Sequence, residues 1–317
     1  MSKEEAPFVI FYNVTKWYKG NVIGLNQFTA QVSGGITGLV GPNGAGKSTF
    51  LKLATGQIKP NIGIVRVFNK DPFRDSSVFN DLGYCPEQDA FWSWMTGKEF
   101  VEILAKAKGY SKEEAKKETT RVLKIVSLDD ERADRPIITY SKGMRQRIKV
   151  AQALIGSPSL LLLDEPFAGA DPITRAHLGR TFEDLRKEGV SIILSSHVLH
   201  EVEQFADQIK LIYRGRLLAE GPVRDIRALI YDHPHRIKIL TDSPRELAKY
   251  FVSLPSVKSL EITDPSNLHY GILWILTHNP AVFYKELPKV LVSSKVHVEE
   301  IMSVDDNLQA VFEYLTQ

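Results

Sequence analysis

The sequence has little of what marks a secreted or membrane-embedded protein. Its 317 residues include one cysteine, Cys85, which excludes an intrachain disulfide framework and fits a reducing compartment. Residues 1–7 are polar and acidic, so we expect no secretory signal there. No apolar run approaches the roughly 20 residues that a membrane-spanning helix needs. We therefore expect any role at a membrane to depend on a partner protein.

The chain also lacks a strong net charge. Lys and Arg number 40 against 38 Asp and Glu, which gives +2 at pH 7 and no general reason to expect a nucleic-acid partner. Hydrophobic residues make up 43% and charged residues 25%, as in ordinary soluble proteins. The length is sufficient for a full hydrophobic core and predicts two domains.

One glycine-rich stretch, residues 41–49 with the sequence GPNGAGKST, dominates what is present. It lies between an apolar β-branched run, residues 36–40, and a helical pattern from Phe50. Glycines let successive backbone N–H groups point into one concavity that binds phosphate, and the helix N-terminus adds its positive dipole end. Lys47 is expected to reach the β- and γ-phosphates, and Ser48 to bind Mg²⁺. The predicted nucleotide-contacting residues of this phosphate loop are Asn43, Gly44, Ala45, Gly46, Lys47, Ser48 and Thr49.

Two carboxylates follow a second apolar run. Four leucines at 160–163 predict a central parallel strand, and Asp164 and Glu165 come directly after it. Ligands of open α/β sheets bind at this end of the strands. Asp164 suits a Mg²⁺ ligand, and Glu165 suits a base that accepts a proton from attacking water.

A histidine follows another predicted strand, residues 191–195. His197, His200 and Glu201 have helical spacing, so a metal site is one interpretation of these residues. It is disfavoured because no nearby residue supplies the further carboxylates or thiols of such sites. A single histidine beside a phosphate site is the preferred interpretation of His197.

Two aromatic residues precede a predicted turn at residues 20–21. Tyr18 is the candidate to stack on an adenine ring, and its neighbour Trp17 is the competitor. Packing at an edge of the core is the structural alternative for either ring.

Helical patterns are predicted from about 96 to 156. Thr96 with Glu99, and Ser111 with Glu114, form capping boxes that open two helices. Ser141 is the expected N-cap of a helix that runs to Gly156, and this N-terminus could bind a second phosphate. Before these helices lies an aromatic pentad, residues 91–95, whose structural alternative is packing inside the helical region.

In order along the chain, these motifs resemble the nucleotide-binding domain of ATP-binding cassette (ABC) transporters. The resemblance covers residues 8 to about 228 and also includes Gln88 as the glutamine loop and Asp171 in the D-loop. The signature motif, residues 141–146, has Lys142 where glycine is commoner, a variant that looks like the ABC-2 exporter branch. The D-loop has Ala170 where leucine is usual.

The resemblance implies an α/β P-loop ATPase fold, residues 1–228, with a helical subdomain at about 90–156. It implies two such subunits packed head to tail around ATP and Mg²⁺. Glu165, His197 and Gln88 would be catalytic, and Ser48, Gln88 and Asp164 would hold the metal. Ser141 and Gly143 would contact the ATP bound to the other subunit.

The remainder, 229–317, is expected to form a small α+β domain after a polar linker at 231–235. Its patterns predict strand, helix, strand, strand, helix and strand, the ferredoxin-like order. The predicted ranges are 236–240, 244–253, 257–262, 268–277, 280–289 (capped by Asn279) and 296–301, with a last helix at 306–315. Residues 303–312 look like the tail of ABC-2 exporter ATPases.

The predicted function is therefore the ATPase subunit of an ABC-2-type exporter, on the cytoplasmic face of the membrane. A transmembrane permease would dock at Gln88–Met95, called the docking segment below, and the second nucleotide-binding subunit would be an identical or homologous chain. Three alternatives stay open. An importer ATPase would share every motif, a translation-type ATPase would normally carry two cassettes, and a non-enzymatic regulator would lack Glu165.

Overall fold

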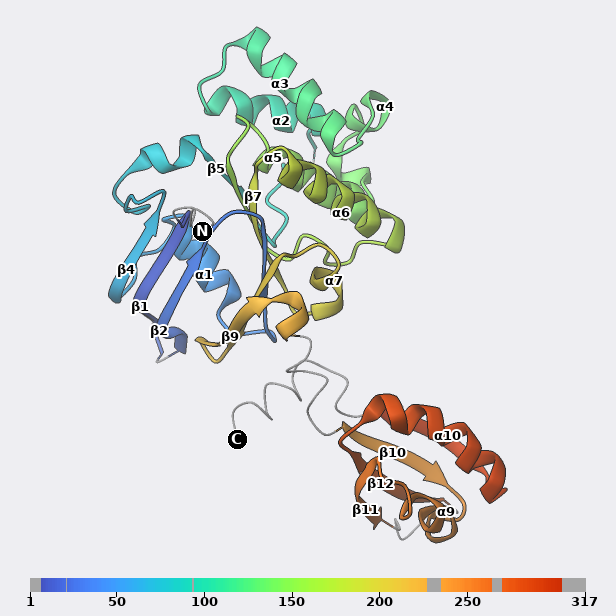
Figure 1. Ribbon diagram of the computed structural model, residues 1–317. Coiled ribbons are helices and arrows are strands. Elements are labelled where there is room, and N and C mark those ends of the chain that lie inside the picture. Colours follow the sequence, from blue (N-terminus) through green and yellow to red (C-terminus); the bar gives the residue numbers. More distant parts are fainter. Residues whose placement is uncertain (1–6, 21, 93, 227–234, 264–269, 304–317) are drawn as a thin grey trace. The chain divides into compact units, whose positions relative to one another are not determined.

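The computed structural model describes residues 7–20, 22–92, 94–226, 235–263 and 270–303 (Figure 1). The chain divides into two compact units, Met1–Val223 and Arg224–Gln317. The boundary that the sequence suggested, after residue 228, falls in a stretch outside the described residues. No helix within the described ranges is long and apolar enough to cross a bilayer.

A six-stranded sheet forms the centre of the first unit, in the order β5-β6-β7-β3-β8-β9. Its first five strands are parallel, and β9 pairs antiparallel with β8. The predicted strands at 36–40, 160–163 and 191–195 are confirmed, and β6 is buried along its whole length. The strands are β3 (Ile36–Val40), β5 (Leu82–Cys85), β6 (Leu160–Leu163), β7 (Ser191–Ser196), β8 (Gln208–Tyr213) and β9 (Arg216–Pro222).

An antiparallel sheet of order β2-β1-β4 covers α1 (Lys47–Ala54) in the same unit. Its strands are β1 (Val9–Tyr18), β2 (Val22–Val32) and β4 (Ile62–Val67). Phe50 of α1 stacks on Phe11 of β1, with ring centroids 4.2 Å apart. These rings belong to a core cluster that also includes Leu39 and Leu160 of the larger sheet. The helix that follows the phosphate loop is thus fixed by packing on both sides.

The helical region groups α2, α3 and α4 together (Figure 1). Both predicted capping boxes are present, with reciprocal bonds between Thr96 and Glu99 and between Ser111 and Glu114. The predicted helix to Gly156 is wrong at its end, because Gly156 (φ 85°) and Ser157 (φ 50°) adopt left-handed backbone. The helices are α2 (Gly97–Ala107), α3 (Lys112–Ile125), α4 (Asp130–Ala133) and α5 (Lys142–Ala153).

Two further helices and two 3₁₀ turns complete the described elements between β4 and β8. Asp171 caps α6 by accepting a 2.9 Å hydrogen bond from the backbone N–H of Thr174. The elements are η1 (Ser76–Asn80), η2 (Ile137–Thr139), α6 (Pro172–Lys187) and α7 (Leu199–Glu203).

The second unit contains a four-stranded antiparallel sheet, ordered β11-β12-β10-β13. The order of its elements is the predicted ferredoxin-like one. Helices α9 and α10 cover one face of the sheet, where Phe251 stacks on Phe283. The elements are β10 (His235–Thr241), α9 (Pro244–Phe251), β11 (Val257–Thr263), β12 (Gly271–Thr277), α10 (Pro280–Ser294) and β13 (Val298–Ser303).

Some predicted boundaries of this unit differ from the structure. α10 continues past the predicted end at Lys289 to Ser294, and Asn279 caps it as expected. β12 begins at Gly271, and residues 268–269 lie outside the described ranges. The linker residues 231–234, the predicted helix 306–315 and the tail from 304 also lie outside them.

Candidate functional site

The phosphate loop joins the end of β3 to the start of α1 and lines a cavity of about 360 Å³. Gly44 (φ 78°) and Gly46 (φ 115°) adopt backbone that favours glycine. A Cβ on Gly46 would come within 2.4 Å of the Gly24 carbonyl oxygen, so this position also needs glycine for space. The cavity is lined by Tyr18, Val22, Ile23, Gly24, Asn43, Gly44, Ala45, Gly46, Lys47, Ser48, Thr49, Glu87 and Glu165.

Lys47 is buried, and its ammonium group has three oxygen neighbours. Nζ donates to the carbonyl oxygens of Gly41 at 2.7 Å and Pro42 at 3.3 Å. It also lies 3.3 Å from Oε1 of Glu165, whose side chain is 7% exposed. An ion pair removed from water persists only with such additional hydrogen bonds. The structure thus brings the predicted phosphate-binding and base residues together.

Ser195 of β7 links the two carboxylates that follow β6. Its Oγ donates to Oδ1 of Asp164 at 2.7 Å and accepts from the backbone N–H of Glu165 at 2.8 Å. Glu165 itself has φ 48°, a left-handed backbone that costs a non-glycine residue roughly 1–2 kcal/mol. The two carboxylates have different partners, since Asp164 accepts from Ser195 and Glu165 contacts Lys47 and His197. The sequence interpretation did not assign Ser195 to the site.

One signal could have identified Ser195. It is a polar residue that ends an apolar strand, and β7 was predicted to lie in a parallel sheet. The carboxyl ends of neighbouring parallel strands meet at one edge. Leu163 pairs with Leu194, which places Ser195 beside Asp164.

Asp164 and Ser48 offer oxygen ligands of the kind that Mg²⁺ prefers. Burial raises the pKa of the Asp164 carboxyl, and hydrogen bonds from Ser195 and Ser48 act in the opposite direction. Ser48 lines the cavity, whereas Asp164 does not line it and is 2% exposed. This pair of residues fits the metal that the sequence predicted.

His197 lies on the other side of Glu165 from Lys47. Its Nδ1 is 3.0 Å from Oε2 of Glu165, so each carboxylate oxygen has its own nitrogen partner. The residues of the alternative metal site have separate partners, because His200 pairs with Glu203 at 2.9 Å and Glu201 with Arg175 at 2.8 Å. Within the described ranges, no group of three His, Cys, Asp or Glu residues could hold a metal ion.

Tyr18, rather than Trp17, lines the cavity. The Tyr18 hydroxyl lies 3.1 Å from Oγ1 of Thr49, which anchors the ring beside the phosphate loop. Successive side chains of a strand point to opposite faces, so Trp17 points away from the face that Tyr18 occupies. The geometry favours Tyr18 as the residue that stacks on the base.

Five of the predicted site residues do not line the cavity, namely Gln88, Ser141, Gly143, Asp164 and His197. His197 contacts the cavity-lining Glu165 directly, and Asp164 is linked to it through Ser195. Gln88 is exposed, and its neighbour Glu87 lines the cavity instead. Ser141 caps α5 by accepting from the N–H of Met144 at 3.2 Å, as predicted. Gly143 packs against α6, where an added Cβ would lie 2.6 Å from Oγ1 of Thr174.

The aromatic pentad is divided between packing and exposure. Met95 is 5% exposed, and Phe91 contacts Phe100 edge-on at 5.2 Å between ring centroids. Trp92 is 50% exposed and Trp94 is 73% exposed, whereas Ser93 lies outside the described residues. Trp92 also contacts Phe100 edge-on, with ring centroids 6.2 Å apart, so it is partly packed, whereas Trp94 is not a core residue.

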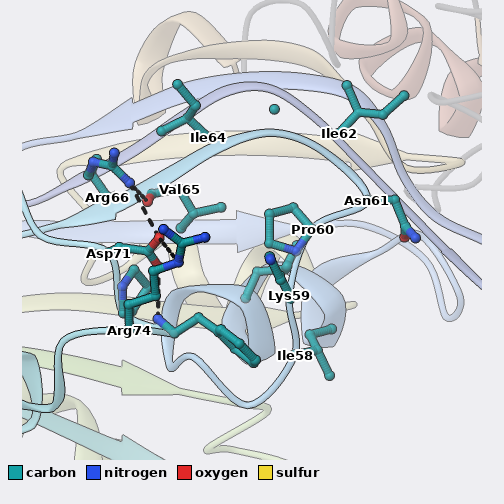
Figure 2. Close-up of a pocket in the computed structure, with 14 residues that line it drawn as sticks. Ile58, Lys59, Pro60, Asn61, Ile62, Ile64, Val65, Arg66, Asp71 and Arg74 are labelled. Carbon is teal, nitrogen blue, oxygen red and sulfur yellow. Dashed lines mark hydrogen bonds and ion pairs between the residues drawn. The ribbon is translucent and has the colours of Figure 1, made fainter.

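A second cavity, of about 280 Å³, lies between β4 and residues 71–74 (Figure 2). Arg66 and Arg74 converge on Asp71 there, at 3.8 and 3.9 Å. None of the predicted site residues lines this cavity. The phosphate-loop cavity is therefore the candidate site.

Comparisons with known proteins identify relatives of this chain. A family model described as ABC transporter matches residues 25–168. The chain is 31% identical over 301 residues to the uncharacterized ABC transporter ATP-binding protein YcbN of Bacillus subtilis (strain 168). This alignment covers 94% of this chain and 94% of that one. It is also 34% identical over 211 residues to ABC transporter A family member 4 of Arabidopsis thaliana, covering 66% of this chain and 22% of that one.

Solved structures show the same fold for the first unit. One is a dimeric post-hydrolysis state of the ATP-binding cassette MJ0796, bound to ADP and Pi. It is 25% identical, with a TM-score of 0.62 over 68% of this chain and 99% of that chain. A second dimeric structure of MJ0796 has a TM-score of 0.63 at 26% identity, over 68% of this chain and 99% of that chain.

Proposed function

The chain belongs to the ABC transporter ATP-binding proteins and is an ATP hydrolase, and we propose that it powers an ABC-2-type exporter. The observation that carries the catalytic assignment is the position of Glu165, with Lys47 at one carboxylate oxygen and His197 at the other. A regulator without hydrolysis would have no use for this carboxylate.

The site's own residues divide the work of phosphoryl transfer. Lys47 and the loop N–H groups bind the phosphates, and Tyr18 stacks on the base. Ser48 and Asp164 would hold Mg²⁺, which supplies positive charge to the phosphate oxygens. Glu165 accepts a proton as water attacks the γ-phosphorus and the bond to ADP breaks. His197 holds Glu165 in place from the far oxygen.

We propose that the site is completed by a second subunit. Ser141 and Gly143 lie at the start of α5 and outside the cavity of their own chain, which suits contact with the other subunit's ATP. The dimeric structures of the related cassette MJ0796 support the pairing of two subunits. Closure of two subunits over ATP would couple hydrolysis to motion.

The proposed permease contact is the docking segment. Exposed Trp92 and Trp94 supply the aromatic area that interface cores favour. Docking there would place the chain on the cytoplasmic face of the membrane. Lys142 in the signature motif and the ferredoxin-like second unit support the ABC-2 class over an importer.

Isolation of the membrane complex tests this assignment. The full chain would be purified with its membrane protein in detergent, and that protein identified by mass spectrometry. In variants that carry a photoreactive residue in place of Trp92 or Trp94, we expect this residue to crosslink to an ABC-2-type permease. A permease that works with an external solute-binding protein would overturn the exporter assignment.

A further inference from the structure

A buried lysine on α5 reaches the loop that carries Gln88. Lys149 is 2% exposed, and its Nζ donates to the carbonyl oxygen of Glu87 at 2.7 Å. The same atom lies 3.3 Å from Oδ1 of Asp89. Burial of an ammonium group costs free energy unless the group is paired and hydrogen-bonded. The contacts with Glu87 and Asp89 therefore offset the cost of burying Lys149.

Arg145 reaches the same carboxylate from one turn earlier on α5. Its Nε lies 3.1 Å from Oδ2 of Asp89, so each oxygen of this carboxylate has a cation from one helix face. Arg145 also donates through a terminal nitrogen to the carbonyl oxygen of Tyr140, at 2.9 Å. Tyr140 directly precedes Ser141, so Arg145 contacts both the glutamine loop (residues 86–89) and the start of the signature motif.

Both neighbours of Gln88 are thereby fixed to the helix that presents Ser141 and Gly143. We propose that Lys149 and Arg145 are positioning residues that make the glutamine loop and α5 move as one body. The docking segment begins in this loop. When the permease displaces this segment, Asp89 and α5 therefore displace Ser141 as well. This inference rests on the proposed function, in which Ser141 acts on the partner's ATP, and on the role at the chain's own ATP that the family resemblance implies for Gln88.

A residue that contacts the C-terminal end of α5 provides a matched control. Arg121 of α3 donates to the carbonyl oxygen of Leu154 at 2.9 Å and pairs with Glu118 at 2.6 Å. It anchors the C-terminal end of α5 without touching the glutamine loop. Loss of Lys149 or of Arg121 should loosen the packing of α5. Of the two, only the loss of Lys149 also removes contacts with the glutamine loop, at the carbonyl oxygen of Glu87 and at Asp89.

The test compares full-length Lys149→Met, Asp89→Asn, Lys149→Arg and Arg121→Met with the unchanged chain. Misplacement of a positioning group by about 1 Å can cost about 100-fold in rate, so we expect kcat for ATP to fall about 10- to 100-fold in the first two variants. KM for ATP should stay within about threefold, because the phosphate loop is untouched. Lys149→Arg should recover much of kcat, and Arg121→Met should keep it while lowering the melting temperature.

Fluorescence provides a second readout. In a Trp17→Phe, Trp274→Phe chain, Trp92 and Trp94 report on the segment that follows the loop. We expect ATP to change their emission in the parent and to lose this effect in Lys149→Met. Unchanged kcat and emission response in Lys149→Met, or an equal loss of kcat in Arg121→Met, would overturn the positioning role of Lys149. A parent chain that hydrolyses ATP as a monomer would instead overturn the proposed composite site.

Discussion

Lys47 and Glu165 form a buried ion pair, with 3.3 Å between Nζ and Oε1, although one begins α1 and the other follows β6. The cation expected to bind phosphate and the carboxylate expected to accept a proton thus neutralise each other. The phosphates of ATP carry more negative charge than one carboxylate, so they would compete for Lys47. Glu165 would then be freed for the attacking water while His197 still holds its other oxygen.

Replacement of Glu165 by glutamine tests this division of roles. Glu165→Gln should retain ATP binding and lose at least about 100-fold in turnover, because general base catalysis contributes about 10²–10⁴ in rate. It should also accumulate as an ATP-bound dimer, seen by size-exclusion chromatography. Lys47→Ala should instead weaken ATP binding itself. Substantial steady-state hydrolysis by Glu165→Gln would contradict the assignment.

Ser195 should be the positioning residue for both carboxylates. Ser195→Ala leaves the Asp164 oxygen and the Glu165 N–H without this partner, which should cost about 1–3 kcal/mol of unfolding free energy. It should also lower kcat for ATP. Ser191→Ala, at the other end of β7, is the matched control and should leave kcat unchanged. Equal kcat values for the two variants would remove Ser195 from the site.

Tyr18 should supply the stacking surface for the base. Base–aromatic stacking is worth about 1–3 kcal/mol, so Tyr18→Ala should weaken ATP binding by that amount in calorimetry. Tyr18→Phe keeps the ring and loses only the hydrogen bond to Thr49, and should bind nearly normally. GTP should also be hydrolysed, because stacking accepts any purine. Unchanged affinity in Tyr18→Ala, or a larger loss in Trp17→Ala, would contradict this role.

The sequence predicted the parts of the site that depend on local pattern. The phosphate loop is set by its own glycines, and Asp164 and Glu165 by the leucines before them. The roles of Ser195 and Lys149 depend on neighbours far along the chain. A lysine on a helix is normally expected at the surface, and only the packing of α5 against the loop after β5 buries Lys149. The exposure of Trp92 and Trp94 was likewise undecided, because an aromatic pentad fits a core or an interface equally well.

Trp92 and Trp94 should matter for assembly and little for folding. The double variant Trp92→Ala, Trp94→Ala should change the unfolding free energy by only about 1 kcal/mol, because both residues are at least half exposed and only Trp92 contacts the core, at Phe100. Phe100→Ala is the matched control, since Phe100 is 3% exposed and its loss should cost about 3–5 kcal/mol. The double variant should fail to co-purify with the membrane partner. Normal assembly by this well-folded variant would rule out docking through these rings.

The single thiol gives a probe of unfolding in the first unit. Cys85 is fully buried at the end of β5, and burial raises its pKa from 9.0 to about 12. The thiolate is the reactive form, so a disulfide reagent at pH 8 should label the native chain only through unfolding. Labelling should become fast in denaturant. Rapid, stoichiometric labelling of the native chain would contradict this burial.

The same shift predicts a pH dependence of stability. Above about pH 9 the unfolded chain loses the Cys85 proton while the folded chain keeps it, so the unfolded state binds fewer protons. The contribution of Cys85 is therefore fully present below pH 9 and is lost as the pH rises towards about 12. Its slope should approach about 1.4 kcal/mol per pH unit in that window. Urea unfolding of the parent and of Cys85→Ala should be compared at pH 7.5, 9.5 and 10.5. Lysines and tyrosines titrate in both chains, so the difference in unfolding free energy between the chains isolates the contribution of Cys85. The difference between the two curves should shrink only at the higher values, and a constant difference would show that the thiol ionises equally in both states.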